Sequence, residues 1–343
     1  NSATTEYSCT VKNNISSVTV NATATSTKSK VRGLGTKELV VGKNTLPIRV
    51  IAEDGSEKIY NVNARRIAGI ASSIKIFGKT FKVIDAEPTL TTSSNNTSDE
   101  SGLYASTDTN TRNPTYYFRG NVENNYVSFA GFTWRIVRVN EDGTIRIVMQ
   151  DGINSNATYA FNSNYNNYTY MYYTNSQAKT QLESWYQTNI GSKKDLASSV
   201  ASGAYYCEQA KSAYDGNYIS DSGADMIFYP QYIPSFKCNL DKNKNGIVSA
   251  NVGLLTYDEM VYAGGYGRAI NNNYYLSTSY QSWTMSPAGV YSGTAHIWPL
   301  YTHSDYVYCS TEKSYALRPV INLKSNIKVS SGDGTKDSPF IIE

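Results

Sequence analysis

The side chains most capable of acid–base or nucleophilic chemistry lie near the C-terminal end of the chain. The sequence contains only two histidines, His296 and His303, and Cys309 follows shortly after them. A thiol and an imidazole can act as a nucleophilic pair, but a third group usually orients the imidazole. The residues around His303 supply no such group. We therefore expect no catalytic residue, and we place both histidines on a surface loop.

Motifs for metals and phosphates are incomplete. Residues 241–246 begin with the calcium-loop pattern D-x-N-x-N-G, but Val252 occupies the twelfth position, where that loop needs a bidentate acid. The histidine spacing matches no zinc motif, and no cysteine lies close enough in sequence to complete a zinc site. Phosphate-binding glycine loops, nucleophile elbows and HExxH are absent. The sequence thus predicts no metal, no cofactor and a polar turn at residues 241–246.

Two other groups of charged residues have structural explanations. Asp258 and Glu259 are adjacent carboxylates, but Thr256 and Glu259 also have the spacing of a capping box that begins a short helix. Three arginines, at positions 135, 138 and 146, would suit an anionic ligand. They fall at strand spacing, so we expect solvated side chains on the polar face of a sheet.

The overall composition excludes several classes of partner. The formal net charge is only +3 and 17% of the 343 residues are charged, so the chain has no electrostatic footprint for nucleic acid. It also lacks a polybasic cluster, a signal peptide and an apolar run long enough to span a bilayer. We expect a mature fragment whose export signal, membrane anchor or wall anchor would lie outside it.

Tyrosine is the most unusual component, with 30 residues, of which only Tyr7 and Tyr60 precede residue 69. Tyrosine offers apolar area with little entropy to lose, and its hydroxyl can remain solvated. High Tyr, Ser, Thr and Asn with low Lys and Glu indicates an extracellular protein. Of the four cysteines, Cys207 and Cys238 form a plausible disulfide, and four free buried thiols are an equal alternative.

The elements expected around these residues form two domains joined by a small-residue linker at residues 69–73. Residues 1–68 alternate apolar and polar side chains in short strands, with a hairpin turn at Asp54-Gly55 and an edge strand containing Pro47. Residues 74–343 are expected to contain one strand at 74–84, a surface loop at 89–111 and strands at 115–119, 126–129, 132–139 and 144–150. A helix capped by Ser176 follows, and a weaker helix is expected at residues 193–204.

The segment at residues 283–323 has two stiff ends and a softer middle. We expect its ends to be scaffold, through Trp283, Met285, Leu317, Pro319 and Ile321. The middle mixes large rings with Ser, Thr and Gly, which is typical of a binding surface.

Two family resemblances support this division. The strings at residues 42–45, 52–56 and 60–62 resemble the cadherin-like β-sandwich repeats of bacterial surface proteins, which generally act as spacers. A second set of strings resembles exported Firmicute-type surface domains with a C-type-lectin-like fold: residues 117–120, 126–131, 134–136, 253–265, 274–276, 283–287 and 317–323. The second resemblance implies an α+β C-type-lectin-like domain over residues 74–343, preceded by an all-β immunoglobulin/cadherin-like sandwich.

Within this fold, the chain is most similar to the variable proteins of diversity-generating retroelements. In that family, adenines near the end of the gene are rewritten while invariant strands hold the fold, and the residue types that result are those that fill residues 288–312 here. The fold is shared with formylglycine-generating enzymes, which need a pair of active-site thiols. Only Cys309 falls in this region, so the resemblance does not imply an enzyme.

The resemblance implies a ligand-binding protein for adhesion or receptor recognition, on a bacterial cell surface or a phage particle. Its partner would be a protein or glycan on another cell or surface. The expected ligand surface lies within residues 280–312 and comprises Tyr280, Tyr291, His296, Trp298, Tyr301, His303, Asp305, Tyr306 and Tyr308. Two alternatives stay open: a carbohydrate-binding adhesin of fixed specificity, and a structural surface or pilus subunit.

Overall fold

The computed structural model describes residues 4–90, 99–208, 226–227, 234–238, 246–265, 271, 273–300 and 308–343. The chain divides into two compact units. The smaller comprises Asn1–Ile70 and Thr111–Pro114, and the larger comprises Ala71–Asn110 and Thr115–Glu343. In the described part of the chain, no helix is long and apolar enough to cross a membrane.

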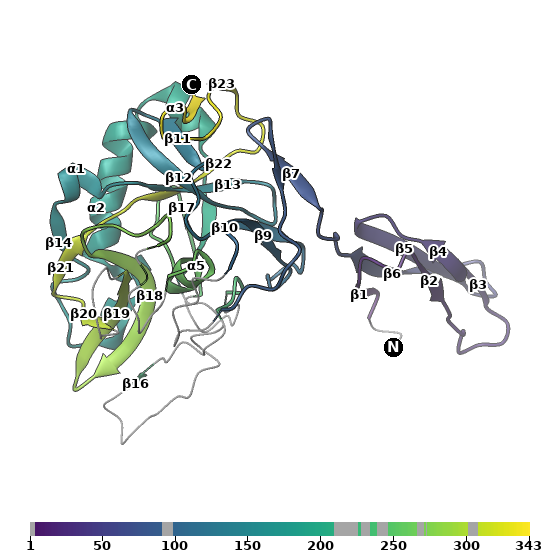
Figure 1. Cartoon of the computed structure of the whole chain (residues 1–343). Coiled ribbons are helices and arrows are strands. Elements are labelled where there is room, and N and C mark those ends of the chain that lie inside the picture. The colour runs from purple at the N-terminus through teal and green to yellow at the C-terminus, as the bar shows by residue number, and fades with distance from the viewer. Residues whose placement is uncertain are drawn as a thin grey trace. The chain divides into compact units, whose positions relative to one another are not determined.

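The smaller unit consists of two sheets (Figure 1). Its strands are β1 (Glu6–Val11), β2 (Ser17–Val20), β3 (Lys30–Arg32), β4 (Gly35–Glu38), β5 (Gly42–Ile51) and β6 (Glu57–Arg66). One sheet has the order β1-β6-β5-β3 and the other pairs β2 with β4. Apolar side chains from both sheets form a small core: Val20, Leu39, Leu46, Ile48 and Ala64.

The β5–β6 hairpin forms as predicted, with Asp54 Oδ1 accepting a hydrogen bond from the Ser56 amide at 2.9 Å and Gly55 at a φ of 84°. The edge position expected for the strand containing Pro47 is only partly correct. Strand β5 lies between β6 and β3, but β3 pairs only with Arg49 to Ile51. Pro47, which has no amide proton to donate, therefore lies beyond the reach of β3.

The larger unit is built on an eight-stranded sheet. Its main path has the order β22-β13-β12-β11-β24-β23, and β10 pairs with both β12 and β9. These strands are β9 (Gly102–Ser106), β10 (Thr115–Arg119), β11 (Tyr126–Phe129), β12 (Phe132–Val139), β13 (Ile145–Met149), β22 (Val320–Leu323), β23 (Val329–Ser331) and β24 (Phe340–Ile342). Strand β24 runs parallel to β11, so the last residues of the chain lie inside the sheet.

A second sheet of the larger unit has the order β14-β21-β18-β19-β20, with β16 also paired to β18. Its strands are β14 (Thr158–Ala160), β16 (Met226–Ile227), β18 (Ser282–Tyr291), β19 (Thr294–Leu300), β20 (Cys309–Ser310) and β21 (Ser314–Ala316). Two further pairs are β7 (Ser73–Ile76) with β8 (Lys79–Lys82), and β15 (Ala204–Cys207) with β17 (Ile247–Ala250).

The helical elements lie around these sheets (Figure 1). They are α1 (Ile153–Asn156), η1 (Tyr168–Met171), η2 (Tyr173–Asn175), α2 (Gln177–Tyr186), η3 (Gln187–Gly191), α3 (Lys194–Ser199) and α5 (Tyr257–Tyr262). Ser176 caps α2 as predicted, because its hydroxyl accepts a hydrogen bond from the Lys179 amide at 3.0 Å. The apolar stripe of α2, which includes Leu182 and Trp185, is buried.

Two elements differ from the sequence-based expectation. The single strand expected at residues 74–84 is a hairpin, because Phe77 and Gly78 both have positive φ and form a two-residue turn between β7 and β8. The surface loop expected at residues 89–111 contains β9, whose Leu103 and Tyr104 are each 2% exposed. Residues 91–98 of that loop lie outside the described residues.

Candidate binding surface

The hairpin of β18 and β19 carries three of the nine residues expected to bind a ligand (Figure 1). Ser292 and Gly293 have φ angles of 49° and 73°, which is the conformation of a tight two-residue hairpin turn. Strand β18 is buried from Ser282 to Val290, whereas Tyr291 beside the turn is 49% exposed. The soft middle expected from residue 288 onward is therefore a hairpin as far as residue 300, with register shifts between Trp283 and Pro287 and between Pro287 and Gly289.

Three of the predicted ligand residues form one ring cluster. The rings of His296 and Tyr308 meet edge to face with centroids 5.1 Å apart. Tyr291 lies 6.5 Å from His296 and 6.4 Å from Tyr308. These spacings are typical of aromatic pairs. Because Tyr291 is exposed and the other two rings are half-buried, the cluster presents an amphipathic surface. We call Tyr291, His296 and Tyr308 the hairpin surface.

His296 is held in one orientation by its own strand. Its Nδ1 lies 2.6 Å from the Thr294 carbonyl oxygen, which can only accept a hydrogen bond, so we assign the proton to Nδ1. Burial lowers the pKa of His296 and outweighs the opposing effect of that hydrogen bond. The imidazole is therefore neutral at pH 7, and its Nε2 is left as an acceptor.

Trp298 does not belong to the exposed surface, which corrects the sequence-based expectation. It is 2% exposed, and its ring packs between Tyr308 at 5.9 Å and Tyr257 at 5.2 Å. Alternate residues of a strand share a face, so Trp298 lies on the same face as His296 but closer to the base of the hairpin, where other elements cover it. Its indole Nε1 has no hydrogen-bond partner among the described residues.

The remaining predicted residues lie apart from the cluster or outside the described residues. The Tyr280 hydroxyl donates to the Gln150 carbonyl at 3.0 Å, and the side chain is half-buried. Tyr280 is therefore anchored to the loop after β13. The other four residues fall within residues 301–307, outside the described residues: Tyr301, His303, Asp305 and Tyr306. The calcium-like pattern at residues 241–245 is likewise outside them.

Helix α5 connects the hairpin to the interior of the larger unit. The Tyr257 amide donates to Ser286 Oγ of β18 at 2.9 Å, while its ring packs on Trp298 of β19. The predicted capping box is present: Thr256 and Glu259 exchange backbone and side-chain hydrogen bonds of 3.0 Å each. The start of α5 is thus fixed to both strands of the hairpin.

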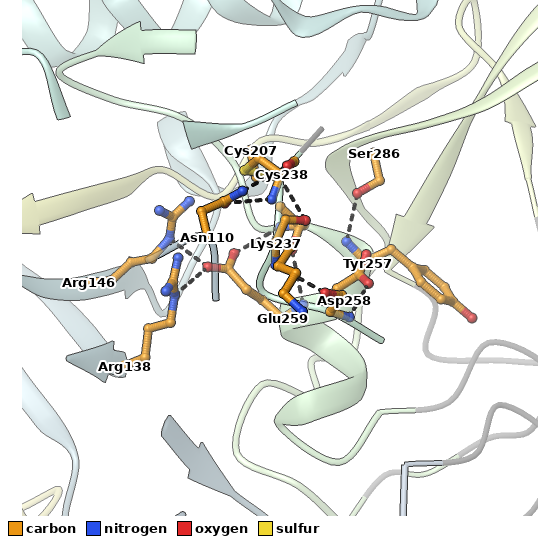
Figure 2. Close-up of a disulfide and its surroundings, with 12 residues drawn as sticks. Asn110, Arg138, Arg146, Cys207, Lys237, Cys238, Tyr257, Asp258, Glu259 and Ser286 are labelled. Atoms are coloured by element: carbon orange, nitrogen blue, oxygen red, sulfur yellow. Dashed lines mark hydrogen bonds and ion pairs between the residues drawn. A yellow bond between two sulfur atoms is a disulfide. The ribbon is translucent and has the colours of Figure 1, made fainter. Parts of the chain in front are cut away.

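Figure 2 shows the ionic centre next to this helix start, where Glu259 meets two arginines. Glu259 Oε1 lies 3.0 Å from Arg138 Nε and 2.9 Å from Arg146 Nε. Burial alone would raise the pKa of Glu259, but the two guanidinium groups outweigh it and hold that pKa below its ordinary value. These interactions position α5 against β12 and β13, which carry the arginines.

The expectation that these arginines are solvated is therefore wrong. Arg146 is 1% exposed, and Arg135 is 3% exposed with its guanidinium 3.7 Å from the Tyr126 ring centre. Both faces of these strands are covered, so charge on them must be compensated internally. The sequence signal for such a centre was the capping residue Glu259 itself, because one carboxylate can both cap a helix and pair with arginine.

A disulfide joins Cys207 to Cys238, which decides between the two alternatives left open by the sequence (Figure 2). Asn110 holds the Cys238 backbone from both sides: its Oδ1 accepts from the amide at 2.8 Å and its Nδ2 donates to the carbonyl at 2.9 Å. Cys9 is a free cysteine, and Cys309 Sγ lies 3.2 Å from the Tyr315 hydroxyl. Within the described residues, no three His, Cys, Asp or Glu side chains gather as a metal site would require.

Comparison with known proteins identifies the smaller unit. Residues 1–67 match the family described as a cadherin-like beta sandwich domain, which confirms that part of the sequence-based resemblance. Neither the curated proteins nor the solved structures contain a match to the chain. A cadherin-like sandwich is consistent with a surface protein of the adhesion type.

Proposed function

We propose that this chain is an extracellular ligand-binding protein, and that it acts in adhesion or receptor recognition without catalysis. The cadherin-like unit would be the spacer, and the larger unit would be a C-type-lectin-like domain. The observation that carries the proposal is the hairpin surface. There Tyr291, His296 and Tyr308 gather beside an exposed turn, while the strands that carry them are buried below.

The mechanism is binding by a preorganised surface. Rings supply contact area with little loss of side-chain entropy, and hydroxyl groups and the His296 Nε2 give direction through hydrogen bonds. The hairpin is fixed to α5, so little ordering free energy is lost when a ligand binds. Retroelement diversification would supply the variety of the surface.

The proposed test compares matched tyrosine variants of the full chain on a glycan array and on immobilised cell-surface proteins. The Tyr291→Ala/Tyr308→Ala variant should lose at least tenfold in affinity for whatever wild type binds. Tyr205→Ala is the control, because Tyr205 is 74% exposed on β15, outside the hairpin surface. Equal binding by wild type and the double variant would contradict the proposal.

The retroelement part of the proposal has a separate test at the level of DNA. Diversification predicts a near-copy of the codons for residues 288–323 beside a reverse-transcriptase gene, differing only at adenines. A locus without such a copy would leave a binding protein of fixed specificity. In that case, glycan binding that survives calcium chelation would identify a carbohydrate-binding adhesin.

A further inference from the structure

Strand β8 has a strand partner on one side only within the described part of the chain. The two-residue turn at 77–78 makes alternate positions of the β7–β8 hairpin hydrogen-bonded. The Val83 amide continues this alternation by donating to the Ser72 carbonyl at 2.8 Å. Thr80 and Lys82 fall at the other positions, so their peptide groups point away from β7. Just beyond β8 this edge is taken, because Val83 forms a parallel bridge with Leu103 and the Ile84 amide donates to the Leu103 carbonyl at 2.8 Å. From Thr80 to the Lys82 amide, the edge is available for another strand.

A cleft of about 560 Å³ runs along this same edge. All four residues of β8 line it, and its opposite wall consists of residues 101–103 and 121–124. Phe81, Phe118 and Val122 form an apolar floor below a polar rim. The volume and the combination of apolar floor and polar rim are typical of ligand sites. The cleft shares no residue with the hairpin surface.

The charge of the cleft favours an acidic occupant. Two lysines, Lys79 and Lys82, face one carboxylate, Glu123. Lys79 Nζ donates to the Asp333 carbonyl at 2.6 Å and lies 5.6 Å from the Phe81 ring centre. An ammonium group has three donors, so Lys79 is held at the cleft and can still bind an anion. Lys82 is exposed.

We propose that this cleft binds an extended, acidic peptide segment of another protein, which adds to β8 as a further strand. The peptide backbone would exchange hydrogen bonds with Thr80 and accept one from the Lys82 amide. Alternate side chains would point to the apolar floor, and an acidic side chain would reach Lys79 or Lys82. A sulfated saccharide would match the charge but not the regular spacing of unpaired peptide groups, so a strand is the better occupant.

The test is fluorescence anisotropy of the full chain with a fluorescein-labelled decapeptide of alternating valine and glutamate. Saturable binding is expected, and lysine in place of glutamate should weaken it at least tenfold. Two N-methylated versions of the peptide are compared. One carries its methyl groups on the valine amides and the other on the glutamate amides, so each version blocks hydrogen bonding along one edge of the peptide. Strand addition uses a single edge, so one version should bind at least tenfold more weakly than the other.

Two variants locate the binding on β8. Thr80→Pro removes the outward-facing amide of β8 and should weaken peptide binding at least tenfold. Lys75→Pro makes the same change on β7 and should not weaken peptide binding. Lys82→Glu should weaken binding similarly, with Lys75→Glu as its control for charge. Circular dichroism checks that each variant is folded. If a proline variant is not folded, the lysine variants provide the test of binding on β8.

Several results would overturn the proposal. They are failure of the valine–glutamate peptide to bind, equal affinity of its two N-methylated versions, or wild-type affinity in both Thr80→Pro and Lys82→Glu. Tighter binding of a sulfated oligosaccharide of equal charge would assign the cleft to saccharides instead.

Discussion

Glu259 Oε1 lies 2.9 Å from Arg146 Nε, and both side chains are at most 2% exposed. Arg138 shares the same oxygen, so one carboxylate compensates two guanidinium groups beside the start of α5. A buried ion pair adds little stability compared with apolar residues, but removal of one partner leaves a charge uncompensated. The main role of this ionic centre is therefore to fix the position of α5.

The first prediction follows from this centre. Glu259→Gln keeps the shape of the side chain but leaves Arg138 and Arg146 without their carboxylate. We expect the free energy of unfolding to fall by about 3–5 kcal/mol. Urea denaturation followed by tryptophan fluorescence measures this, since all four tryptophans lie in the larger unit. The control is Glu183→Gln, because the partner of Glu183, Lys179, is near the surface. An equally large loss of unfolding free energy in that variant would refute the explanation.

The second prediction concerns pH. Glu208 is fully buried, and its carboxylate accepts hydrogen bonds from the Thr174 amide at 2.6 Å and hydroxyl at 2.9 Å. Burial raises the pKa of Glu208 to about 7, although these hydrogen bonds and Lys179 act in the opposite direction. The folded protein therefore holds the carboxyl proton of Glu208 more tightly than the unfolded chain does. The contribution of Glu208 to the stability of the folded state is consequently smallest above pH 7.

Stability should therefore fall by up to about 3 kcal/mol as pH rises from the ordinary glutamate pKa of 4.5 to about 7. Urea midpoints between pH 4.5 and pH 8 measure the effect. Glu208→Gln should remove this part of the pH dependence, whereas Glu183→Gln should keep it. An unchanged pH profile in Glu208→Gln would show that another group is responsible.

The third prediction concerns the disulfide. Cys207 and Cys238 are 31 residues apart in sequence, and closing a loop of that length is worth about 3–4 kcal/mol in a chain-entropy treatment. The Cys207→Ser/Cys238→Ser variant should lose that much unfolding free energy. Cys9→Ser, at an exposed position of the smaller unit, should change stability by less than about 0.5 kcal/mol. A stable double variant would mean that the unfolded chain is not restrained by the bridge.

The strands of the larger unit could largely be predicted because their apolar and β-branched segments are separated by turn residues. The expected segments 115–119, 126–129 and 132–139 coincide with β10, β11 and β12. The hairpin turn after β12 also forms, with the Asn140 amide donating to the Thr144 carbonyl at 2.8 Å. Local propensity and turn chemistry agree there, so no tertiary information is needed.

The errors arise where a distant segment decides burial. Arg146 looked solvated because its carboxylate partner, Glu259, is far away in sequence. Trp298 looked exposed because it falls in a segment that mixes large rings with Ser, Thr and Gly, whereas Tyr257 and Tyr308 cover its ring. Strand β9 was missed because residues 102–106 are too short to show a period. Periodicity reports which side chains share a face, but not how far along a strand that face is covered.

The central claim is that the rings beside the hairpin turn are free to change while those nearer its base hold the fold. The most direct test is the unfolding free energy of Tyr291→Ala/His296→Ala compared with Trp298→Ala, both measured by urea denaturation. We predict a loss of about 1 kcal/mol or less for the double variant, and about 3–5 kcal/mol for Trp298→Ala. Equal, large losses in both variants would show that the hairpin surface is part of the core, and would contradict the account.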